Sequence, residues 1–254
     1  MIKLKGLVVC AVAGVAALAL GAQQKQTSIF QVEFQTPKNG MVKQYEEGRK
    51  QKIAWHKQMK DSRPLFVWQI MTGEQTGTYV VGGSPVHWKD LDNPPISEDA
   101  DQAEWDKVIG NTVAGFVLHN YEYMEDMSRP SDAMMPSKFA EVLTFSVKME
   151  KTEEWVADFK KIDESIKKTN WPGHYRLYSL AHGGRVGTFV LVIEHPSYAD
   201  FQEPAKTFNM MLAEALGKDD AKALSKRMDS DVNSIESQFV KFRQDLSYFP
   251  AAAK

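Results

Sequence analysis

The hydrophobic positions of this chain follow two periods, which recur in the same order in each half. Apolar runs typical of strands come first, at 30–35 and again at 141–147. Amphipathic stretches with the period of a helix follow, at 40–60 and 151–168. The pattern therefore predicts that each half begins with a strand and continues with a long helix.

Two further apolar runs follow each helix, and a glycine-containing phrase separates them. The phrase reads GEQTGTYVV from Gly73 and GGRVGTFVL from Gly183. Because glycine adopts a positive φ without strain, we expect a tight turn between two strands at both places. The remaining predicted elements are a helix and a last strand in each half, at 101–113 and 121–127, then at 208–228 and 235–245.

The two halves align at a constant offset of 110 residues, as from Gly73 to Gly183. No gap is needed over about sixty residues, and aromatic positions fall on aromatic positions, which indicates an internal duplication. The predicted order is βαββαβ twice, so the fold class is α+β with two tandem ferredoxin-like units. We place these units at 23–137 and 138–254. Each unit leaves one sheet face uncovered, so we expect the two sheets to face each other.

This order and the duplication resemble the dimeric α+β barrel superfamily. That superfamily includes antibiotic-biosynthesis-monooxygenase-like, stress-responsive barrel and NIPSNAP-like proteins. The resemblance implies an intrachain, pseudo-dimeric α+β barrel, because both units lie in one chain. The resemblance covers nearly all of residues 23–254. No catalytic motif of the superfamily is found in this sequence, so the resemblance bears on fold far more than on function.

The first 22 residues have the pattern of a secretory signal peptide. Lys3 and Lys5 precede an uncharged run that ends in small residues, with cleavage expected after Ala19 or Ala22. We therefore expect an exported protein, periplasmic or secreted, without stable membrane insertion after cleavage. Cys10 is the only cysteine. Its removal would leave no disulfide, cysteine nucleophile or cysteine metal ligand.

Charge and motif content exclude several classes of function. The formal net charge is −2 and no basic cluster alternates with aromatic residues, which argues against a nucleic-acid partner. The six histidines show neither an i,i+4 pair on a predicted helix nor an HExxH motif, so we predict no metal site. Binding of a small-molecule ligand remains compatible with the sequence. We expect a monomeric pseudo-dimer or a homodimer.

The first predicted helices of the two halves differ in chemistry at equivalent positions. The second carries an apolar stripe suited to a sheet, formed by Trp155, Phe159, Ile162 and Ile166. The aligned positions of the first are Tyr45, Arg49, Lys52 and His56. Buried cations need partners, which sheet carboxylates such as Glu33 or Glu125, or an anionic ligand, would supply. The bland alternative is a helix rotated by one residue, with Ile53 inward and Lys52 reaching solvent.

We predict a ligand site between this helix and the sheet of the first unit. Its candidate residues are Tyr45, Arg49, Lys52, His56, Trp68 and Tyr123, with His56 as the best catalytic candidate. Three hypotheses remain open: a non-catalytic binder of a small, partly apolar or anionic molecule, an enzyme, and a scaffold for a protein partner. The enzyme would resemble the cofactor-independent monooxygenases or the haem-binding superfamily members. We predict no cofactor, with haem on His56 as the alternative.

Overall fold

The computed structural model describes residues 27–133 and 135–250, so the predicted signal peptide at 1–22 lies outside the described residues. The first half contains β1 (Ile29–Pro37), α1 (Val42–Gln58), β2 (Leu65–Ile70), β3 (Tyr79–Gly83), α2 (Glu98–Val108) and β4 (Val113–Tyr123). The second half contains β5 (Phe139–Val147), α3 (Thr152–Lys168), β6 (Tyr175–His182), β7 (Thr188–His195), α4 (Phe208–Leu216), α5 (Lys218–Asp231) and β8 (Val232–Phe242). Both halves have the predicted element order, except that the second helical segment of the second half is divided at Gly217.

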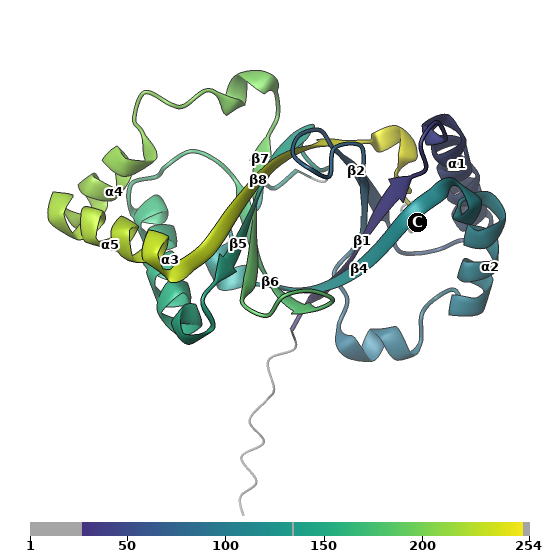
Figure 1. The fold of residues 1–254 in the computed structure, drawn as a ribbon, viewed down its shortest axis with the longest axis horizontal. Coiled ribbons are helices and arrows are strands. Elements are labelled where there is room, and N and C mark those ends of the chain that lie inside the picture. Colours follow the sequence, from purple (N-terminus) through teal and green to yellow (C-terminus); the bar gives the residue numbers. More distant parts are fainter. Residues whose placement is uncertain (1–26, 134, 251–254) are drawn as a thin grey trace, which may run out of the picture.

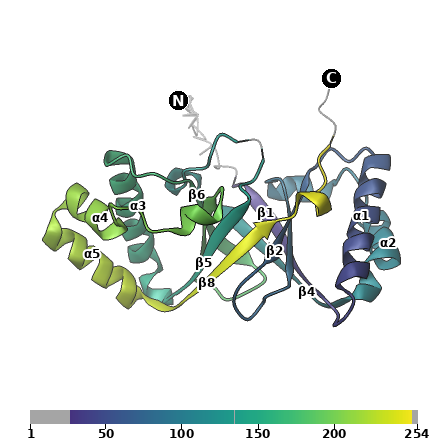
Figure 2. The same cartoon turned by 90° about the horizontal axis from the view of Figure 1, so that it is seen from above.

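The strands form a closed antiparallel barrel in the order β1-β3-β2-β8-β5-β7-β6-β4. The two sheets meet edge to edge, because β2 pairs with β8 and β4 pairs with β6. All helices lie outside the barrel, with α1 and α2 on one side and α3, α4 and α5 on the other (Figures 1 and 2). The prediction of an α+β fold is therefore confirmed, and the strands of both halves close a single barrel.

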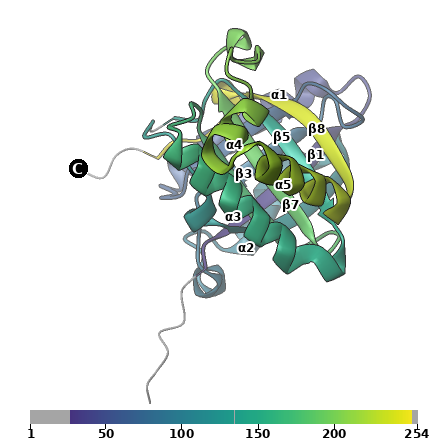
Figure 3. The same cartoon turned by 90° about the vertical axis from the view of Figure 1, so that its left-hand side faces the viewer.

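Each helix layer covers the outer face of its own sheet. The core of the second half joins α3 to β6 and β7, with Trp155 and Leu177 fully buried. Figure 3 shows α3, α4 and α5 in front of the barrel. The core of the first half is smaller and includes Tyr45, Tyr79 and Ile109. A third cluster fills the barrel interior and contains Ile70, Ala140, Val240 and the neighbouring Trp68.

Side-chain caps fix where two of the shorter helices begin. The hydroxyl oxygen of Ser97 accepts a hydrogen bond from Ala100 N before α2, and that of Thr207 accepts one from Met210 N before α4. Such caps satisfy backbone donors that have no partner within the helix. Among the helices within 27–250, none combines the length and the apolar character needed to cross a membrane.

The repeated glycine phrase forms the β2–β3 and β6–β7 turns, as the sequence predicts. Gly73 and Gly183 have φ of +86° and +102°. A Cβ at Gly183 would lie 2.4 Å from Leu118 O, and one at Gly73 would lie 3.3 Å from Gln238 Cγ. Leu118 belongs to β4 and Gln238 to β8, so each turn packs against the last strand of the other half. The glycines thus serve both the turn and the contact between halves.

Candidate functional site: a buried polar face under helix α1

The inner face of α1 carries four polar side chains that are almost completely buried. Tyr45, Arg49, Lys52 and His56 are 0%, 3%, 3% and 3% exposed. Their spacing along the sequence places them on one side of the helix, toward the outer surface of the first sheet. Ile53 is only partly buried. The rotated alternative, with Lys52 in solvent, is therefore wrong, and the polar face points inward.

Side chains of β1 contact the first two of these residues. Tyr45 Oη donates a hydrogen bond of 2.8 Å to Gln35 Oε1, and Gln35 Nε2 donates one of 2.6 Å to Glu33 Oε2. Burial raises the pKa of the Glu33 carboxyl, although the Arg49 guanidinium opposes the shift. Arg49 Nε is buried with no hydrogen-bond partner among the described residues. The network therefore leaves one guanidinium nitrogen unsatisfied beside a carboxyl that resists ionisation.

Lys52 is held by the first turn of α2. Its Nζ donates a hydrogen bond of 2.6 Å to the backbone oxygen of Asp101 and lies 3.0 Å from that residue's Oδ1. Burial lowers the pKa of the Lys52 ammonium, and the bond to Asp101 opposes this shift. The Asp101 side chain is 45% exposed, so it links a buried cation to solvent.

His56 forms a buried pair with Asp61, which directly follows the end of α1. The distance between His56 Nδ1 and Asp61 Oδ2 is 3.0 Å, and the Asp61 side chain is 1% exposed. Because the carboxylate can only accept, Nδ1 carries the proton in the neutral ring and Nε2 keeps its lone pair. Nε2 is buried, has no hydrogen-bond partner among residues 27–133 and 135–250, and lies 3.8 Å from Asp101 Oδ1. This arrangement is that of a general base oriented by a carboxylate.

Aromatic rings fix the plane of the His56 imidazole. Tyr248 stacks on it with a centroid distance of 5.5 Å, and Trp55 meets it edge-on at 5.1 Å. Tyr248 Oη also donates a hydrogen bond of 2.6 Å to the backbone oxygen of Asp61. Residues near the C-terminal end of the described chain therefore complete a site whose base lies in the first half.

Helix α2 packs across α1 and covers the polar face. At its C-terminal end, a Cβ on Gly48 of α1 would lie 2.0 Å from Val108 O. At its N-terminal end, Asp101 bonds to Lys52 and lies 3.8 Å from His56 Nε2. No residue of α2 is buried, so the helix separates the polar face from solvent with a single layer.

The structure does not bring Trp68 and Tyr123 to this face, which corrects their place in the predicted site. Neighbouring strand residues point to opposite faces, and Val67 belongs to the core under α1 while Trp68 packs in the barrel interior. Tyr123 contacts Phe30 on the interior side, with a centroid distance of 5.9 Å. Both residues are thus separated from His56 by the sheet.

The equivalent face in the second half is sealed by apolar packing. Trp155 lies 4.6 Å from Phe189 and 5.5 Å from Phe159 between ring centroids. Ile162 and Ile166 complete the buried stripe. Helix α3 also buries Asp158 and Asp163, but these lie outside the four aligned positions and are paired with Arg227, Lys161, Lys167 or Tyr175. The position that corresponds to His56 is Ile166, so the buried histidine belongs to the first half.

Three residues of the site were not predicted from the sequence. Glu33 lies beside Arg49 as expected, but Asp61 and Asp101 supply the carboxylates that pair with His56 and Lys52, and Tyr248 supplies the stacked ring. Glu125 instead lies in a short 3-10 helix after β4. Only Asp61 carried a usable signal, since it follows α1 immediately and the chain must turn back there.

The surroundings of His56 do not fit haem, the cofactor that the resemblance raises. Haem needs a wide apolar cleft beside its axial ligand. Here Tyr248 covers one face of the imidazole, and Lys52 and Asp101 lie next to Nε2. Among the described residues, no group of three or more His, Cys, Asp or Glu side chains could hold a metal ion.

Stability should fall as the pH decreases below about 6.5, because the folded state resists protonation of His56. Burial lowers the pKa of its imidazole and the Lys52 ammonium lowers it further, while Asp101 and Asp61 oppose the shift. The unfolded chain, with an ordinary histidine pKa near 6.5, then binds more protons than the folded chain, so acidification favours unfolding. Burial lowers the pKa of His119 as well.

The test is the free energy of unfolding measured by urea denaturation from pH 7.5 to 5. We expect the dependence on pH to be smaller in His56→Gln than in the wild type, with a residual slope that His119→Gln reduces further. An unchanged slope in His56→Gln would contradict the assigned neutral state of His56.

Comparisons with solved structures identify the fold. A monooxygenase candidate from Lactobacillus acidophilus superposes with a TM-score of 0.55 at 9% identity, covering 90% of this chain and 99% of the other. An anthrone oxidase-like protein gives 0.52 at 12% identity, covering 87% and 93%. A chlorite dismutase variant from Candidatus Nitrospira defluvii gives 0.51 at 10% identity, covering 85% and 92%. These proteins therefore share this chain's fold, an α+β fold with a closed antiparallel barrel of eight strands.

Matches at such low identity show a shared fold only. They do not show which reaction, if any, this protein carries out. No protein-family model matches the sequence, and neither does any curated protein. The barrel matches nearly the whole length of each structure above, so the likeness extends over both halves of the chain. What this protein does must be argued from the polar face under α1.

Proposed function

We propose that this dimeric α+β barrel is a monooxygenase-like enzyme in which His56 removes a proton from a small organic substrate. The observation that carries the proposal is the buried His56 Nε2, which has no hydrogen-bond partner in the part of the chain that the structure describes, while Nδ1 is held by Asp61. A base of this kind contributes about 10²–10⁴-fold to a proton-transfer step. The monooxygenase candidate and the anthrone oxidase-like protein with the same fold support this class of reaction.

The proposed reaction needs no cofactor and takes dioxygen as the oxidant. A carbon acid loses a proton to His56 Nε2, and the resulting carbanion or enolate reacts with O₂. The CH₂ carbon exchanges its two hydrogens for one oxygen atom, and the second oxygen atom leaves as water with those hydrogens. Four electrons pass from the substrate to O₂, so no other reductant is consumed.

Lys52 beside His56, and Arg49 next to Lys52 along the same face, suit the negative charge that this step creates. Lys52 Nζ and the unsatisfied Arg49 Nε both belong to the same buried face, where an oxyanion would interact with them strongly. Asp101 now occupies the position next to Lys52 and His56. An enolate oxygen could take the place of the Asp101 carboxylate when the first turn of α2 moves outward. The substrate class is therefore a small, partly apolar molecule with an acidic C–H beside a carbonyl group.

Anthrone in aerated buffer provides a direct test. We expect the purified protein to consume O₂ and anthrone in a 1:1 ratio and to form anthraquinone, followed with an oxygen electrode and by absorbance. Anthrone binding without oxygen uptake would favour the non-catalytic binder. If neither anthrone binding nor turnover occurs, and 2-hydroxynaphthoquinone and phenylpyruvate give the same result, the enzyme proposal is wrong.

We also propose that the barrel arose by duplication, with two units in one chain, and that the protein is exported. The shared element order and the equivalent glycine turns support the first, and the pattern of residues 1–22 supports the second. We expect the protein recovered from outside the cytoplasm to begin at Leu20 or Gln23. Intact-mass and native-mass measurements should then give a processed monomer. Retention of residues 1–19 would contradict export by this signal.

A further inference from the structure

The barrel interior opens at one end into a polar hollow that belongs to the second half. Its volume is about 230 Å³, and its lining consists of four hydroxyl-bearing residues with one cation and one anion, namely Thr144, Ser146, Thr188, Ser234, Arg185 and Glu236. It lies on the opposite face of the barrel wall from the helices and in the other half from His56. It is therefore separate from the polar face under α1.

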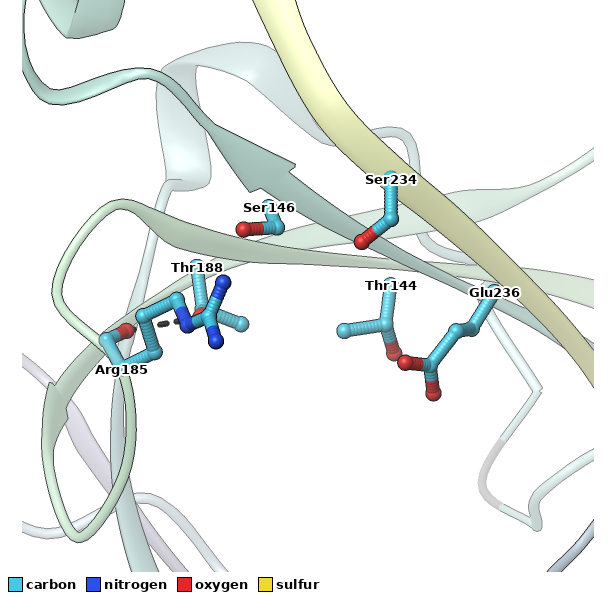
Figure 4. A pocket seen from close by; sticks show the side chains of 6 residues that line it. All are labelled: Thr144, Ser146, Arg185, Thr188, Ser234 and Glu236. Carbon is cyan, nitrogen blue, oxygen red and sulfur yellow. Dashed lines mark hydrogen bonds between the residues drawn. The ribbon is translucent and has the colours of Figure 1, made fainter.

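The strand register shows that these side chains share the inner face. Thr144 is directly opposite Glu236 on β8, and Ser146 is opposite Ser234 there and Thr188 on β7. Directly paired residues in neighbouring strands point to the same side of a sheet. Arg185 reaches this group from the β6–β7 turn. Figure 4 shows Arg185 and Glu236 at opposite sides of the hollow, with the hydroxyl groups between them.

The polar groups of the hollow are poorly satisfied within the protein. Ser146 Oγ is buried and has no hydrogen-bond partner among the described residues. Within the same part of the chain, neither Arg185 nor Glu236 forms a side-chain ion pair, although both line one small space. Thr188 Oγ1 donates to the backbone oxygen of Arg185, which ties the turn to the rim. A cation and an anion are thus available to a ligand without breaking existing pairs.

The equivalent positions of the first half indicate that the fold does not require this polarity. Phe34 is opposite Val117 where the second half has Thr144 opposite Glu236, and Thr36 is opposite Gly115 where it has Ser146 opposite Ser234. In the first half, Thr36 Oγ1 and Thr78 Oγ1 satisfy each other at 3.0 Å. The equivalent strands of the first half therefore line the barrel with apolar residues, or with hydroxyl groups that bond to each other. The charges and free hydroxyls of the second half need another explanation.

We propose that the hollow binds a small zwitterion of the amino-acid class. A carboxylate would pair with the Arg185 guanidinium, which presents a fork of donors suited to two oxygen atoms. An ammonium group would pair with the Glu236 carboxylate on the far side. The hydroxyls of Ser146 and Ser234 would bind a polar body between the two charges. The volume suits a molecule with a short polar side chain, such as serine.

The experiment measures binding of L-serine by isothermal titration calorimetry and by amide chemical shifts. L-serine methyl ester lacks the carboxylate, and N-acetyl-L-serine lacks the ammonium group, so each tests one end of the hollow. We expect both to bind at least roughly fivefold more weakly than L-serine, since each loses one charge-assisted contact at a partly exposed site. The perturbed amides should be those of β5, β7, β8 near 234–236 and the 183–187 turn.

Two exposed variants assign the charges, and a matched variant of the first half serves as control. In Arg185→Gln, L-serine and its methyl ester should bind equally weakly. In Glu236→Gln, L-serine and N-acetyl-L-serine should bind equally weakly. Gln75→Ala changes the first-half counterpart of Arg185 and should leave serine binding unchanged.

Three results would overturn the proposal. They are absence of binding at tens of millimolar serine, equal binding of serine and both derivatives by the wild type, and binding of glucose that exceeds that of serine and ignores both charge variants. Anthrone oxidation should be unaffected by Arg185→Gln and Glu236→Gln. The failure of either site therefore leaves the other open to its own test.

Discussion

Replacement of His56 by glutamine should slow the oxidation of anthrone by about 10²–10⁴-fold, which is the range for the loss of a positioned general base. The amide nitrogen of glutamine can still donate to Asp61, so the buried carboxylate keeps a partner. An amide cannot accept the substrate proton at neutral pH. The loss should therefore appear in kcat/KM while the folded structure persists, as measured by oxygen uptake and circular dichroism.

His182→Gln provides the matched control for this substitution. His182 is exposed at the end of β6, outside the polar face under α1. We expect its kcat/KM to equal that of the wild type within twofold. Equal losses in both histidine variants, or full activity in His56→Gln with anthrone, would assign His56 and Asp61 to a structural ion pair.

Replacement of Trp155 by alanine should lower the free energy of unfolding by about 3–5 kcal/mol, the usual cost of removing a large buried aromatic side chain. Trp155 is fully buried and contacts Phe145, Phe159 and Phe189. Its loss leaves a cavity that the surrounding rings can fill only in part. The measurement is urea denaturation at pH 7.5, where the titration of His56 does not contribute.

Two further variants show whether this loss reflects the sealed core. Tyr198→Ala removes a side chain that is 62% exposed and should change the free energy of unfolding by about 0.5 kcal/mol or less. Tyr45→Phe changes the position equivalent to Trp155 and leaves Gln35 Oε1 without its partner, at a cost of about 1–3 kcal/mol. A loss in Trp155→Ala no larger than that in Tyr198→Ala would contradict the packing of α3.

The inward polar face of α1 could be predicted because the alignment of the two halves of the sequence supplies an internal comparison. Trp155 and its neighbours form an unmistakable apolar stripe, and the constant offset transfers its direction to Tyr45 and His56. The partners could not be predicted in the same way. Asp101 approaches Lys52 only because α2 packs across α1, and no local pattern encodes that crossing.

The wrong placement of Trp68 has a simple physical cause. The β2 segment LFVWQI is apolar on both faces, since one face meets α1 and the other fills the barrel. Alternation along the strand then cannot indicate which residues face the helix. The polar hollow was missed for a related reason. Thr144 and Glu236 are about ninety residues apart, and only the β5–β8 register brings them together.

The position of Tyr248 has a consequence for the order in which the protein is made. During translation, His56 and Asp61 are synthesised long before Tyr248. The Tyr248 ring covers the imidazole, and its backbone pairs with Leu65. β8, which closes the barrel against β2, also emerges late. The nascent first half therefore lacks the ring that covers His56. If His56 is the proposed base, a polypeptide that ends before Tyr248 would carry all four polar residues of α1 and be inactive.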